Sequence, residues 1–180
     1  SDWRQQLPNY AEITWTEQYF SDHQNIGSSY SDFVVWEFDP LSSETINIDD
    51  NGRRHTIVPD ETTPGSVWVF GGSTVFGTGV NDVNTIPSLL AGKTGLKAVN
   101  FGGDNYIARQ GVIRLLREYE TNYAENLIVV FYDGVNDVHV KCRVENLDLV
   151  TDRQTQIRSA LGDSRAAQDA SPIQLFGPAR

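Results

Sequence analysis

The sequence predicts an α/β protein with a parallel sheet. Short apolar runs occur at 66–70, 96–101 and 126–132, as expected for strands that are covered on both faces. Helical patterns separate these runs, and a strand-helix-strand-helix-strand order is typical of parallel strands joined by right-handed crossovers. The 180 residues are about the size of one ordinary domain. We therefore expect a three-layer α/β/α sandwich.

Two segments supply the crossover helices. The first covers 85–91, where Pro87 suits a first helical turn and Gly92 and Gly95 suit the exit. The second covers 108–123, where apolar residues recur at helical spacing and form one stripe that we expect to face the core. This stripe consists of Ala108, Val112, Leu115, Leu116, Tyr119 and Tyr123.

The segments outside the sheet region show weaker patterns. Residues 1–24 have aromatic and aliphatic residues at roughly helical spacing, which predicts a helix on the surface of the core. Runs at 33–38 and 44–48 predict an antiparallel ribbon, followed by a turn at 50–52. Residues 152–168 could form a polar helix with Ile157 and Leu161 facing inward. We expect residues 1–65 to be an extension packed on an α/β domain at 66–180.

Charge and composition exclude several classes of protein. The formal net charge is −10, and residues 1–66 hold twelve acidic against three basic side chains. Nucleic-acid binders need a basic footprint, so DNA and RNA are not expected partners.

The longest apolar run, at 127–132, is far short of the ~20 residues that cross a bilayer. The single cysteine, Cys142, cannot form an internal disulfide, and we interpret it as a packing residue.

Small polar residues follow each predicted parallel strand. Gly71-Gly72-Ser73 follows the first strand, the segment 100–106 contains the end of the second, and Asp133 to Asp137 follows the third. In open α/β sheets, ligands bind outside the carboxyl ends of the strands. One edge would therefore gather a hydroxyl, flexible backbone N–H groups and a side-chain amide, which are the parts of an acyl-transfer site.

These three blocks resemble, in order, the first three sequence blocks of the SGNH (GDSL-type) esterase and lipase superfamily. They span 67–137, and the upstream segment 46–56 is also similar to the segment that precedes the nucleophile strand in some bacterial members. The resemblance implies a flavodoxin-like fold, with Ser73 as the nucleophile and its own N–H in the oxyanion hole. It also implies that the Asn136 side-chain amide binds the same oxyanion.

The third oxyanion donor is less clear because the family usually has a glycine five residues after the position of Asn100. Here that residue is Asn105, which tolerates positive φ better than other non-glycine residues. Gly103 is the competing candidate if the loop is shortened.

Two departures from the family pattern affect the expected mechanism. The first block has Gly72 where the family has aspartate, which leaves the nucleophile in place. The family's Asp-x-x-His block, which supplies the base and its orienting acid, has no match here. His139 follows Asn136 but is not preceded by a suitable Asp-x-x. We expect that the chain is a piece of a longer product and ends before this block, and hence that its esterase activity is weak or absent.

Plainer interpretations stand beside these roles. Ser73 could be only a helix N-cap, and Asn136 only a turn residue that caps the next helix. Asn105 and Gly103 could simply shape a turn. We interpret His23 and His55 as surface or packing residues, and the literal Gly-Asp-Ser at 162–164 as coincidence.

Neither a metal nor a nucleotide cofactor is expected. His139 with Asp133 and Asp137 could be imagined as a metal cluster, but such loop carboxylates are more often solvated or capping. The glycine-rich segment 72–78 imitates the start of a P-loop but has Thr78 where the phosphate-binding lysine belongs. The segment 87–94 has the lysine but Pro87 in place of the first glycine.

The sequence therefore favours a serine esterase that acts on a small-molecule or glycan-borne ester. The alternatives are a non-catalytic carbohydrate- or partner-binding module on the same fold, since fold and loops can outlive the chemistry, and an O-acyltransferase. The resemblance alone favours a periplasmic or secreted location, and the oligomeric state stays open.

Overall fold

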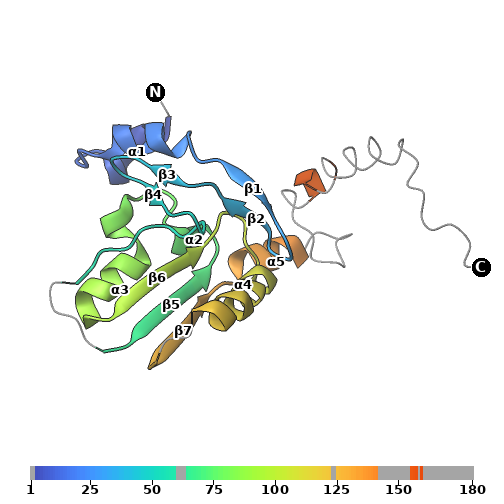
Figure 1. Ribbon diagram of the computed structural model, residues 1–180. Helices are drawn as coiled ribbons and strands as arrows, with labels where there is room; N and C mark the ends of the chain where they lie inside the picture. Colours follow the sequence, from blue (N-terminus) through green and yellow to red (C-terminus); the bar gives the residue numbers. More distant parts are fainter. Residues whose placement is uncertain (1–2, 60–63, 123–124, 142–154, 158, 160–180) are drawn as a thin grey trace, which may run out of the picture.

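The computed structural model describes residues 3–59, 64–122, 125–141, 155–157 and 159. Its core is a parallel sheet in the order β6-β5-β7 (Figure 1), formed by β5 (Ser66–Gly71), β6 (Lys97–Gly102) and β7 (Leu127–Tyr132). The central strand pairs in register with both neighbours, so that Gly71 lies opposite Gly102 on one side and Tyr132 on the other. The prediction of three parallel strands is confirmed.

Helices pack against alternate side chains of the central strand β5. Val67 and Val69 of β5 belong to a buried cluster with Val75 of α2 (Ser73–Phe76), Ala91 of α3 (Ile86–Thr94) and Ala98 of β6. The other set, Trp68 and Phe70, clusters with Phe101, and Leu115 of α4 (Ala108–Thr121) packs against it. The chain is thus a mixed α/β protein in which a parallel sheet is packed by helices.

Helix α3 begins as the sequence predicts but continues through Gly92, beyond the predicted end at 91, to Thr94. Thr85 is its N-cap and accepts a hydrogen bond from the Ser88 N–H, while Pro87 lies in the first turn. Gly95 ends the helix in the left-handed conformation, with a φ of 72°. The short helix η3 (Asp82–Asn84) precedes α3, and α5 (Val135–Lys141) follows β7.

The predicted core face of α4 is wrong. Val112, Leu116 and Tyr119 are 47%, 61% and 48% exposed. The buried residues of this helix are Gln110, Gly111, Arg114 and Glu118. Within the predicted stripe Leu115 does pack on the sheet cluster, and Tyr123 lies outside the described residues.

The buried polar side chains of α4 find partners in the N-terminal region. The Gln110 amide donates to the carbonyl of Val34, and the Arg114 guanidinium donates to the carbonyl of Asn51. Arg117 binds the Glu37 carboxylate, with its Nη1 at 2.8 Å from Oε2. A polar face can be buried here because carbonyl and carboxylate groups of another segment accept its hydrogen bonds.

The N-terminal region is less helical than predicted. Two short 3₁₀ helices, η1 (Trp3–Gln6) and η2 (Pro8–Tyr10), precede α1, which covers only Thr16–His23 of the predicted helix at 1–24. The predicted ribbon between the runs at 33–38 and 44–48 is wrong, because each run pairs with a neighbouring segment instead. Two antiparallel ribbons form: β1 (Ser28–Ser31) pairs with β2 (Val35–Phe38), and β3 (Leu41–Ser42) pairs with β4 (Asn47–Ile48).

Arg54 joins this N-terminal region to the sheet region. Its buried guanidinium donates to the Asp82 carboxylate at 2.8 Å and to the carbonyls of Phe76, Gly77 and Val80. Phe76 also belongs to a core cluster with Tyr19, Phe20, Ile46 and Ile48. Residues before 66 therefore share both a polar anchor and an apolar core with residues after it.

Other sequence predictions fall largely on residues outside the described part of the chain. Of the predicted helix at 152–168, residues 155–157 and 159 are helical, and Ile157 packs against the cluster of Val34, Trp36 and Tyr106. Cys142 and residues 162–164 are not described.

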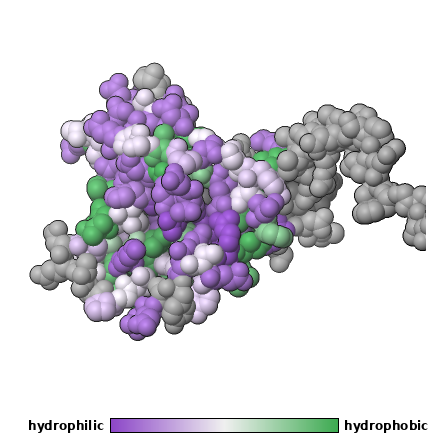
Figure 2. Space-filling model, viewed as in Figure 1, coloured by the Kyte–Doolittle hydropathy of each residue, from purple (hydrophilic) through white to green (hydrophobic). Residues whose placement is uncertain are grey.

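Within the described residues, every helix is too short or too polar to span a bilayer. Figure 2 shows a mainly hydrophilic face with separate hydrophobic patches.

Candidate functional site

The carboxyl ends of the parallel strands meet at one edge of the sheet. Because Gly71 lies opposite both Gly102 and Tyr132, the segments that follow the three strands start side by side. Ser73, the loop at 103–106 and Asn136 belong to these three segments. The structure thus assembles at one edge the segments in which the candidate residues lie.

Ser73 is the first residue of α2 and is half-buried. The N-cap of this helix is Gly72, which has an extended backbone and no side chain that could cap the helix. The Gly72 carbonyl accepts hydrogen bonds from the N–H groups of Val75 and Phe76. Among the residues that the structure describes, none forms a hydrogen bond with the Ser73 hydroxyl. Ser73 is therefore not a side-chain N-cap, which was the plainer interpretation of this residue.

Asn136 lies beside the candidate nucleophile. Its Nδ2 donates to the Tyr106 carbonyl at 2.8 Å. A Cβ at position 72 would lie only 2.6 Å from the same nitrogen, so a residue larger than glycine would displace the amide. Asn136 thus bridges the loop after β6 and the turn that presents Ser73.

The two candidates in the loop after β6 differ in the use of their backbone N–H. The Gly103 N–H donates to the Gly71 carbonyl at 3.0 Å and so extends the pairing of β5 with β6. Asn105 is exposed and has a φ of 61°. This left-handed conformation was expected because the SGNH family usually has a glycine at this position. No acceptor for the Asn105 N–H is found within the described residues. Asn105 is hence the better-placed donor of the two.

Buried groups hold this loop in position. Asn100 is fully buried, accepts from the Gly102 N–H and donates to the Val75 carbonyl at 3.0 Å. The Tyr106 hydroxyl donates to the Trp36 carbonyl at 2.7 Å, and burial raises the pKa of Tyr106 to about 12. This phenol therefore stays protonated and keeps its hydrogen bond at physiological pH.

Two carboxylates flank Asn136 in sequence and have different environments. Asp137 accepts from the N–H of Ala108 at 3.1 Å and so caps the start of α4. Burial, together with the charge of Asp137, raises the pKa of Asp133 to about 6. Within the described residues, no group of His, Cys, Asp and Glu side chains could hold a metal ion, and this includes His139 with these two aspartates.

Sequence reasoning missed a polar group that the fold brings to the same loop. The Asp104 carboxylate accepts from the Thr78 hydroxyl at 2.6 Å, and its Oδ2 lies 4.0 Å from Nε2 of His23. His23 and Asp104 line a cavity of about 210 Å³ together with Ser28 and Asn105 and the apolar side chains of Ile26, Trp36 and Phe38. His23 lies far from the loop in sequence, so no local motif could have signalled this arrangement.

No protein-family model matches this chain, and no curated protein sequence matches it.

Proposed function

We propose that this chain is a serine ester hydrolase of the SGNH type, with the three-layer α/β/α arrangement of that superfamily. The observation that carries the proposal is the contact between the Asn136 amide and Gly72, the residue before Ser73. It supports the assignment of a hydroxyl nucleophile and an amide donor to one small site, which is what an acyl-transfer reaction needs.

Each residue of the proposed site has a chemical role. A general base takes the proton of the Ser73 hydroxyl as its oxygen attacks the ester carbonyl, and the carbonyl oxygen takes up the negative charge of the tetrahedral intermediate. Collapse of the intermediate expels the alcohol, to which the base returns the proton, and water then hydrolyses the ester formed on Ser73. The N–H groups of Ser73 and Asn105 and the second N–H of Asn136 donate to that oxygen. Gly103 has a supporting role, because its N–H is occupied by the Gly71 carbonyl and its carbonyl accepts from the Tyr106 N–H.

The test is hydrolysis of a short-chain aryl acetate by the wild-type chain and by S73A. Because no base is assigned to Ser73, the wild-type rate should be low, and loss of the nucleophile should bring kcat/KM down to the background rate. T74A is the matched control, because Thr74 is the exposed next residue of the same short helix. Equal rates for S73A and T74A, both above the uncatalysed background, would contradict the proposal.

A carbohydrate-binding module is the second candidate function. The cavity beside Asn105 favours it, because polar groups of His23 and Asp104 stand next to aromatic residues there. A module of this kind would bind monosaccharides and hydrolyse no ester, and S73A would leave its affinity unchanged. An O-acyltransferase would instead show S73A-sensitive transfer of the acetyl group to an added alcohol.

A further inference from the structure

A second cavity lies away from the proposed site. Its volume is about 570 Å³, within the ~300–1,000 Å³ that small-molecule sites occupy. Its walls come from β3, β4, the segment 53–59 and residues 97–99 of β6. Those three residues form the amino-terminal half of the strand, whereas Ser73 and Asn105 follow the carboxyl ends. The cavity is therefore separate from the proposed ester site.

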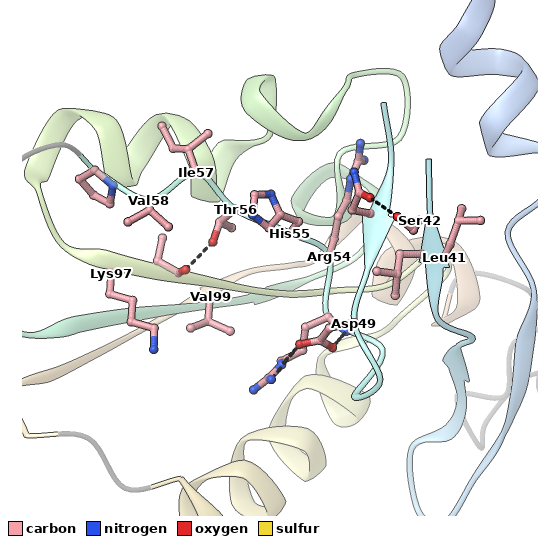
Figure 3. A pocket seen from close by; sticks show the side chains of 15 residues that line it. Leu41, Ser42, Asp49, Arg54, His55, Thr56, Ile57, Val58, Lys97 and Val99 are labelled. Carbon is pink, nitrogen blue, oxygen red and sulfur yellow. Dashed lines mark hydrogen bonds and ion pairs between the residues drawn. The ribbon is translucent and has the colours of Figure 1, made fainter. Parts of the chain in front are cut away.

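The walls of this cavity are mainly aliphatic. Leu41, Ile48, Ile57, Val58 and Val99 all line it. Figure 3 shows Lys97 and Val58 toward one end and Leu41 toward the other, with Val99 between them. The Val58 side chain is 80% exposed, so an apolar ligand that covered it would gain hydrophobic free energy.

The floor of the cavity is held by satisfied polar groups. Arg54 bridges β4 and β6 through its backbone, and its guanidinium is engaged by Asp82 and by three carbonyls. The Thr56 hydroxyl donates to the Ala98 carbonyl at 2.7 Å. The cavity is thus preformed, and the buried charge beneath it is already neutralised.

The charges at the rim are not balanced. Asp49 is neutralised by Arg53, whose Nη2 lies 2.8 Å from its Oδ2. Lys97 is exposed, and none of the described carboxylates forms an ion pair with it. Among the described residues, Lys97 is therefore a cation without an ion pair at the end of an aliphatic cavity, in a chain whose net charge is −10.

We propose that this cavity binds an amphiphilic carboxylate, with the aliphatic chain along Val58 and Val99 and the carboxylate at Lys97. An overall acidic protein repels anions over most of its surface, so a local ammonium group selects the orientation of such a ligand. This inference does not depend on the proposed esterase.

The test uses decanoate, with decyltrimethylammonium as a probe of equal chain length and opposite charge. Calorimetric titration of the full chain should show tighter binding of decanoate. Amide chemical shifts should change at 41–59 and 97–99 rather than at 102–106.

K97Q should weaken decanoate binding roughly two- to fivefold, the range expected for one exposed ion pair. K93Q, at an exposed lysine of α3 that does not line the cavity, should have no effect.

A second pair of variants tests the aliphatic wall. V58E places a carboxylate at an exposed wall position and should weaken decanoate binding further than V83E, a similar change at a half-exposed valine of η3. Equal affinity for the two probes would overturn the proposal. So would a K97Q affinity equal to that of K93Q, or shifts confined to 102–106.

Discussion

Arg54 illustrates how a single residue can join two parts of this chain. Its side chain is fully buried, and every bond that it makes reaches a residue at least nine positions away in sequence. Asp82, its ionic partner, also accepts from the backbone and side-chain N–H groups of Asn47. One guanidinium and one carboxylate thus tie β4 to the turn after α2.

We expect R54M to destabilise the fold strongly. The substitution leaves the Asp82 carboxylate and several carbonyls without their cation, and breaking a buried pair from one side costs about 3–5 kcal/mol. R53A, which removes the neighbouring exposed pair with Asp49, should cost at most about 1 kcal/mol. Urea denaturation of both variants measures this difference. Equal losses would show that Arg54 contributes no more than a surface arginine.

Residue identity also decided which oxyanion candidate is better placed. The left-handed backbone of Asn105 agrees with the expectation from the sequence, because asparagine is among the few residues that adopt it readily. The occupied N–H of Gly103 could not be read from the sequence, since its acceptor belongs to another strand.

At the scale of elements, the pairing of the β1–β2 ribbon with α4 depends on ionised groups. Burial of the Glu37 carboxyl raises its pKa, but hydrogen bonds from Arg117 and the nearby charge of Arg114 outweigh burial and bring the net pKa below the ordinary value of 4.5. A carboxyl with a depressed folded-state pKa contributes stability above its unfolded pKa. That contribution is lost as the pH falls through the folded pKa.

Accordingly, E37Q should lower the melting temperature at pH 7 and have a smaller effect at pH 3, because protonation of the wild-type carboxyl advances as the pH falls toward its folded-state pKa. E120Q is a suitable control, because Glu120 is an exposed carboxylate of α4, the helix whose arginines bind Glu37. Thermal unfolding at the two pH values provides the measurement. A loss of the same size at both would mean that the charge of Glu37 does not hold the ribbon.

For the whole molecule, the β7 edge of the sheet carries exposed apolar side chains among the described residues. Leu116 of α4 and Ile128, Phe131 and Tyr132 of β7 are 41–61% exposed. Within the described part of the chain, β7 has a strand partner on one edge only. Exposed strand edges and apolar surfaces promote association between copies.

We expect the chain to self-associate as its concentration rises, and I128K to shift this equilibrium toward the monomer. A charged side chain on an exposed strand opposes edge-to-edge pairing. V83K, at a half-exposed valine outside the sheet, is the control. Sedimentation velocity over a range of concentrations gives the answer. The prediction fails if I128K and V83K associate to the same extent.

Local sequence patterns were sufficient to predict the order of the elements and the segments at the strand ends. Apolar β-rich runs, turn residues and caps act over a few positions, so the strands at 66–71, 97–102 and 127–132 and the helix α3 could be predicted from them. The buried side of α4, in contrast, depends on contacts with the N-terminal region. Arg114 and Gln110 are buried because Glu37, Asn51 and Val34 provide partners for them. The approach of His23 to Asp104 likewise joins residues far apart in the chain, and periodicity carries no information about such contacts.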